Sequence, residues 1–119
     1  MRNDKPNLIV DMTFNFAVHT INFCEELDKM NKFKLSGQLF RSATSIGANV
    51  REAQNAERKN DFIHKLKIAA KEADETLYWL ALCKSSPILP TNEELYLKAE
   101  QMMRVLSKII ASSKSRNSQ

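Results

Sequence analysis

Glycine and proline are scarce in this chain, and their scarcity limits the possible folds. Only two glycines and three prolines occur in 119 residues. An all-β chain of this length needs turn residues about every ten positions. The composition therefore disfavours that class and favours a few long helices. A single domain of this size can bury a core without disulfides or metals.

Cysteines and long apolar runs are also rare. Cys24 and Cys83 lie far apart, among apolar residues and without CxxC spacing, which predicts buried, reduced thiols. The longest uncharged run, residues 12–24, is too short and too polar to span a bilayer. Polar residues interrupt the only stretch that resembles a secretory signal. We therefore expect a cytoplasmic protein with no membrane contact.

A strong excess of one charge sign is missing as well. The formal net charge is +4 and the isoelectric point is about 9.2. Positive and negative charges are equal in number over residues 1–36. Residues 37–90 carry eight positive charges and six negative, and residues 91–119 carry five positive and three negative. No run of like charge forms a basic arm that would grip phosphates. One copy would bind nucleic acid poorly, whereas an oligomer that repeats one face would bind better, because the potentials add.

The sequence does contain four amphipathic segments, in which apolar residues recur at steps of three and four. The predicted helices span about 7–30, 36–56, 61–85 and 91–111. Together they form one domain over 1–111, and the polar residues 112–119 are expected to be a disordered tail. Four such segments with short connections predict an all-α, antiparallel, up-down-up-down four-helix bundle.

Polar residues are expected to cap three of these helices. Ser36 and Asn60 are the predicted N-caps of the second and third helices, and Asp61 is well placed against the helix dipole. Thr91 and Glu94 form the pattern T-x-x-E, a capping box that is expected to begin the fourth helix.

The first helix carries two apolar stripes, although a helix in a solitary bundle needs only one, about 100° wide. The second stripe consists of Phe14, Ala17, Ile21 and Cys24. We interpret it as an interface with another subunit. Tyr78 and Trp79 are assigned to an interface too. Adjacent aromatic residues on a helix point in different directions, so we expect one of the two to pack inside the subunit and the other to meet a neighbouring subunit. The alternative for this pair is stacking on nucleic-acid bases.

Patterns of catalytic or metal-binding residues are absent. His19 and His64 fall on different predicted helices, and no glutamate is followed by histidine at the ExxH spacing of metal-binding bundles. Zinc-ligand spacing, a phosphate loop and a dinucleotide fingerprint are missing too. We therefore predict no enzymatic activity, no metal and no cofactor.

The cations of the two central helices have two interpretations. They form either a solvated surface with interleaved acids or a phosphate-contacting surface that gains strength when symmetry repeats it. The residues in question are Arg41, Arg51, Arg58, Lys59, Lys65, Lys67 and Lys71.

Polar residues also stand at fixed positions of the second helix, where amphipathicity alone does not require them. They are Gln38, Arg41, Ser45, Asn49 and Glu52. With Ile46 among them, residues 35–53 resemble the second helix of the bacterial four helix bundle protein family, also called the 23S rRNA intervening-sequence protein family. Residues 61–76 resemble its third helix. Ala53 stands where many members have glycine, which favours a second helix that continues to Ala56.

The resemblance implies four-helix subunits that assemble into a homopentamer. A similar fold serves as the accessory protein of diversity-generating retroelements, a basic pentamer that contacts nucleic acid and a reverse transcriptase. We therefore expect a non-enzymatic oligomeric scaffold that binds RNA or a ribonucleoprotein. The alternative is a structural or adaptor protein that binds another protein without nucleic-acid contact.

The polar residues of the second helix have two possible roles within this resemblance. They are either surface determinants for a partner or a buried polar network that fixes helix register or a subunit interface. The structural role is the favoured one.

Overall fold

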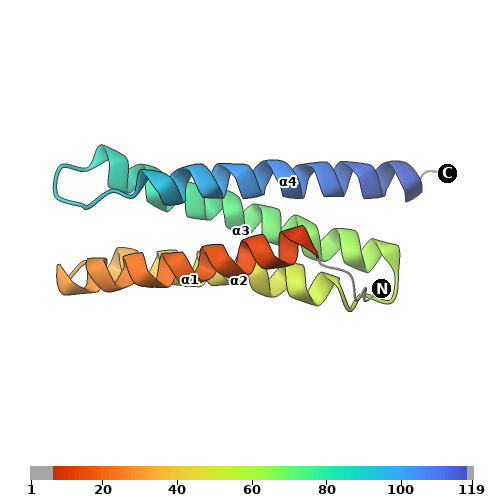
Figure 1. Ribbon diagram of the computed structural model, residues 1–119, viewed down its shortest axis with the longest axis horizontal. Helices are drawn as coiled ribbons and strands as arrows, with labels where there is room; N and C mark the ends of the chain where they lie inside the picture. The colour runs from red at the N-terminus through yellow and green to blue at the C-terminus, as the bar shows by residue number, and fades with distance from the viewer. Residues whose placement is uncertain (1–6, 118–119) are drawn as a thin grey trace.

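Four α-helices make up the chain over residues 7–117, the part described by the computed structural model (Figure 1). The helices are α1 (Leu8–Lys29), α2 (Phe33–Ala53), α3 (Lys59–Ser85) and α4 (Glu93–Asn117). Consecutive helices run in alternate directions along a bundle 51 Å long, and α4 returns to contact α1. The predicted all-α four-helix bundle is confirmed.

The core is formed by one apolar stripe from each helix. Residues of these stripes recur every three or four positions and are completely or almost completely buried. The largest include Phe23, Leu27, Leu39, Ile46, Leu66, Leu80, Met102 and Leu106. Burial of each such side chain stabilises the fold by about 1.5–3 kcal/mol.

Cys24 and Cys83 are part of this core. Both thiols are free and buried, as predicted. Burial raises the pKa of each thiol above its ordinary value, which keeps both protonated at neutral pH. Within residues 7–117, no helix has the length and apolar character needed to cross a bilayer.

Gly47 of α2 lies against the backbone of α1. A Cβ atom at this position would lie 3.4 Å from the carbonyl oxygen of Thr13. A glycine inside a helix costs about 1 kcal/mol relative to alanine. Since 3.4 Å is an ordinary van der Waals distance, an alanine would fit at this position, and the packing does not explain the glycine.

The predicted N-caps of α2 and α3 are wrong. Asn31 adopts a positive φ of 61° and ends α1 in the left-handed conformation, so the chain turns within three residues and α2 already begins at Phe33. Ser36 consequently lies inside the helix, and its buried hydroxyl donates to the carbonyl oxygen of Cys24 at 3.3 Å. α3 begins at Lys59, which places Asn60 inside that helix too.

The capping box predicted at Thr91 is also wrong. Asn92 is the capping residue of α4, because its Oδ1 accepts a hydrogen bond from the backbone N–H of Leu95 at 3.0 Å. Thr91 is exposed and precedes the cap. Threonine and asparagine both cap helices well. Leu95 is buried, and its position sets where the first turn of α4 starts, so Asn92 rather than Thr91 is the cap.

The Asn92→Ala variant is expected to lose about 1 kcal/mol of unfolding free energy, because the N–H of Leu95 loses its acceptor. Thr91→Ala is the matched control and should leave stability unchanged. Urea denaturation followed by circular dichroism measures both values. An equal loss in the two variants would contradict the assignment of the cap.

Two helix ends differ from the prediction. α2 ends at Ala53 rather than Ala56, so alanine in place of the family's glycine does not extend it. α4 continues through the polar residues 112–117, which had been assigned to a disordered tail. Neither glycine nor proline interrupts this stretch, and each added residue contributes one more backbone hydrogen bond. Residues 118 and 119 of that predicted tail lie outside the described residues.

Candidate nucleic-acid interface

The polar motif of α2 lies along the surface seam between α2 and α3. Arg41 donates to the carboxylates of Glu72 and Glu75. Farther along the seam, Lys65 donates to Glu52 at 2.8 Å. Exposed ion pairs contribute at most about 1 kcal/mol each, and a forked arginine is among the stronger ones.

The remaining motif residues lie on the same side of α2. Asn49 donates to the carbonyl oxygen of Ser45 at 2.8 Å, and Gln38 is exposed. Within one subunit these residues do not form a buried network, because the seam is open to solvent; their role in a subunit interface stays a prediction. A buried polar contact does occur beneath it, where the hydroxyl oxygens of Ser42 and Thr76 share a hydrogen bond of 2.8 Å. This pair, which the sequence pattern did not single out, fixes the register of α2 against α3.

The seven predicted phosphate-binding cations do not form one surface. Arg41 and Lys65 are held in the seam, and Arg58 pairs with Asp61 at 3.2 Å. Arg51 is exposed on α2. Lys59, Lys67 and Lys71 lie on the first half of α3, and within the described residues none of these three forms a salt bridge.

The second half of α4 runs beside this half of α3 and is also basic (Figure 1). Residues 59–71 carry four cations and one carboxylate, and residues 102–115 carry three cations and no carboxylate. The single carboxylate, Asp61, is already paired with Arg58. We call the resulting cluster the basic end, and it consists of Lys59, Lys67, Lys71, Arg104, Lys108 and Lys114.

Two observations bring four of these six cations together from different helices. The pKa of Lys67 is lowered because its ammonium group interacts directly with that of Lys114, whose positive charge repels it. Lys59 and Lys108 line the same surface hollow. An anion bound between such ammonium groups would relieve their repulsion, which is the electrostatic condition for a phosphate contact.

Arg104, Lys108 and Lys114 were missed in the sequence. The signal was available, because the stretch 102–115 contains no acid. Over the whole of 91–119 the basic excess is only two charges, because that segment also contains three glutamates. All three glutamates precede residue 102. The opposite end of the bundle differs, because Lys29, Lys32 and Lys34 lie there among several carboxylates.

The predicted interface residues of α1 are only partly available to another chain. Phe14 is 62% exposed and Ile21 37%, but Cys24 is buried inside the subunit, so it offers little surface to a second subunit. α2 adds two exposed aromatic residues, Phe33 and Phe40, at 61% and 46%. Both line a shallow hollow with Ile21. The apolar pattern of the second helix predicts Phe40 in the inner stripe, and that prediction is wrong. We call Phe14, Ile21, Phe33 and Phe40 the apolar patch.

Tyr78 and Trp79 lie on α3, diagonally across the bundle from α1, so they do not extend the apolar patch. Their rings pack edge to face at 5.2 Å, and the indole Nε1 of Trp79 donates to Glu75 at 3.3 Å. Tyr78 is exposed, whereas Trp79 is half-buried. The indole therefore supports the seam around Arg41.

The two histidines lie apart on the surface. His19 of α1 and His64 of α3 are both exposed. His19 lies in a small hollow with Glu26 and Glu94. The salt bridge with Lys98 lowers the pKa of Glu94, and His19 adds a smaller effect in the same direction. In the part of the chain that the structure describes, no group of three or more His, Cys, Asp or Glu side chains is arranged to hold a metal ion.

Comparisons with known proteins place this architecture in a family. The family model for the 23S rRNA-intervening sequence protein matches residues 5–111. The chain belongs to this family. The resemblance of the α2 and α3 motifs is thereby confirmed.

A crystal structure at 1.70 Å resolution supports the same assignment. It shows a protein of unknown function from the S23 ribosomal protein family of Bacteroides thetaiotaomicron VPI-5482. The two chains are 40% identical, with a TM-score of 0.81 over 86% of this chain and 97% of the other. A search of curated proteins gave no match.

Proposed function

We propose that this protein is a non-enzymatic, self-associating helical scaffold that binds RNA through its basic end. One observation carries the proposal: α3 and α4 bring Lys59, Lys67, Lys108 and Lys114 together between them, and the only carboxylate within residues 59–71 and 102–115 is paired with Arg58. Affinity for RNA depends chiefly on such clusters of lysine and arginine, which displace counterions from phosphates.

Self-association strengthens the electrostatic argument. The apolar patch lies on α1 and α2, so a contact there leaves the basic end on α3 and α4 free. Repetition of the basic end around a symmetry axis adds the potentials of the copies. The family resemblance favours a homopentamer, and a cytoplasmic location fits an RNA-binding role.

The test is binding of the purified protein to a structured RNA hairpin, titrated against salt beside a native mass measurement. We expect micromolar or tighter binding that weakens between about 50 and 200 mM salt with a slope of several units. An intact oligomer that fails to bind at physiological salt would overturn the proposal. The alternative, an adaptor that binds another protein without nucleic acid, would then be preferred.

A further inference from the structure

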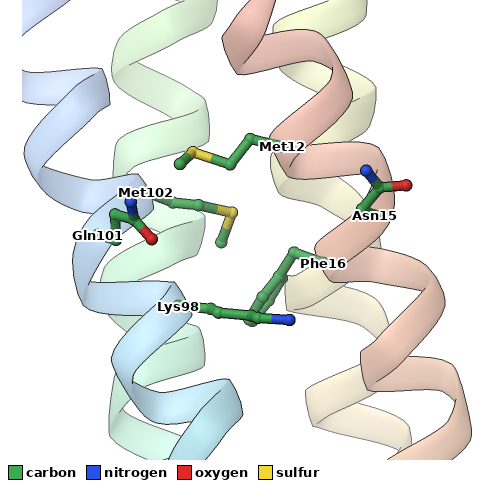
Figure 2. A pocket seen from close by; sticks show the side chains of 6 residues that line it. All are labelled: Met12, Asn15, Phe16, Lys98, Gln101 and Met102. Carbon is green, nitrogen blue, oxygen red and sulfur yellow. The ribbon is translucent and has the colours of Figure 1, made fainter.

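α1 and α4 are the least closely packed neighbours in the bundle, and a groove runs between them. Figure 2 shows its middle, where Met12 and Phe16 of α1 face Met102 of α4. The hollow between them measures about 150 Å³. Asn15, Lys98 and Gln101 complete its lining. Phe16 and Met102 belong to the buried core, so the flexible side chain of Met12 supplies the accessible apolar surface of this hollow.

The groove widens towards the end of α4. A second hollow of about 690 Å³ lies there between α1, α3 and α4. Its apolar lining consists of Leu8, Phe62, Val105 and Ile109, and its polar lining consists of Lys59, Lys108, Ser112 and Ser113. Apolar floors with a few polar groups are typical of binding sites.

Charge changes sign along the groove. Among the residues that the structure describes, no carboxylate lines either of these two hollows. At the opposite end of the groove, a third hollow is lined by Glu26 and Glu94. Lys98, between the two ends, pairs with Glu94 at 3.0 Å. Lys59 and Lys108 therefore leave the wide end positive.

We propose that this groove binds an amphipathic helix of a partner protein, with the partner's aspartate or glutamate side chains beside Lys59 and Lys108. The partner's apolar face would lie on Leu8, Met12 and Val105, as in other complexes where a helix fills a groove. From Lys98 to Ser113 the groove follows α4 for about 22 Å, enough for four turns of helix. The proposal does not rest on RNA binding, but a bound partner and RNA would compete for Lys59 and Lys108.

A second copy of this chain is a poorer occupant. Each of its four helices already places its main apolar stripe in its own core, so no acidic amphipathic helix is left to insert. The apolar patch, which is the exposed surface suited to self-association, lies on α1 and α2 instead. Charge complementarity therefore favours an acidic helix from another protein.

The test uses a displayed library of four-turn amphipathic helices selected against the whole protein. Their apolar positions are fixed, and their flanking positions are varied among Glu, Lys and Ser. We expect at least ten-fold enrichment of Glu near one end of the selected helices. The variant with Lys59→Glu and Lys108→Glu should instead enrich Lys at those positions.

Blocking variants locate the binding. Ser112→Trp fills the groove from an exposed position and should abolish the enrichment, whereas Ser107→Trp, exposed on the same helix but outside the hollows, should preserve it. Three outcomes would each overturn the proposal. They are a selection without enrichment of Glu, enrichment of Lys by the native protein, and equal enrichment of Glu by both tryptophan variants. A fall of the native mass to that of a monomer in Ser112→Trp would also overturn it, because the groove would then be a self-association surface.

Discussion

Replacing Phe40 with aspartate is expected to leave the protein monomeric, because the proposed self-association buries this side chain. The Phe40 side chain is 46% exposed in the subunit and lies beside Phe33 and Ile21. Burial of a phenylalanine in a subunit contact contributes about 1.5–3 kcal/mol, and a desolvated carboxylate in its place adds a penalty. A loss of about 3 kcal/mol per contact lowers an association constant by more than a hundred-fold. Native mass measured over a dilution series gives the result.

Leu97→Asp is the matched control for this substitution. Leu97 is 54% exposed on α4, away from the apolar patch, and its replacement should leave the native mass unchanged. Both substitutions fall on exposed positions, so circular dichroism should show the helical content of the parent protein. Phe40→Asp that stays assembled, or Leu97→Asp that dissociates, would contradict the assignment of the patch.

The second large effect is expected from charge reversal at the basic end. A variant with Lys67→Glu, Lys71→Glu and Lys114→Glu should bind an RNA hairpin on the order of a hundred-fold more weakly, since three phosphate contacts become repulsions. The salt slope of binding should fall by about one unit for each lysine that contacts a phosphate. Fluorescence anisotropy at several salt concentrations measures both quantities.

A variant with the same net charge separates location from total charge. Lys29→Glu, Lys32→Glu and Lys34→Glu reverse three lysines at the opposite end of the bundle. This variant should keep most of the affinity. If both triple variants lose affinity equally, RNA responds to net charge alone, and the basic end is not its site.

The number of helices and the core were predictable because they follow from local periodicity. The recurrence of apolar residues at three and four positions is set by helix geometry and needs no knowledge of the neighbouring helices. The N-caps were not predictable in this way. Ser36 and Asn60 are good capping residues by type, but the tight turn at Asn31 and the packing of the bundle set the first turns elsewhere.

The basic end was only half visible in the sequence. Lys67 and Lys71 were recognised because they fall in one predicted helix, but Lys114 stands 47 residues after Lys67 and meets it only through the antiparallel pairing of α3 and α4. The ion pairs of Arg41 and Lys65 also depend on a partner helix. Assignment of a charged residue as free or paired therefore needed the structure.

Lysine acetylation of the intact protein, measured by mass spectrometry with and without an RNA hairpin, most directly tests where RNA binds. We expect RNA to protect Lys67, Lys71, Lys108 and Lys114 by several-fold, while Lys29, Lys32 and Lys34 react at the same rate in both samples. Two results would contradict RNA binding at the basic end. One is protection of Lys29, Lys32 and Lys34 alone, and the other is unchanged reactivity of all these lysines under conditions where the RNA is bound.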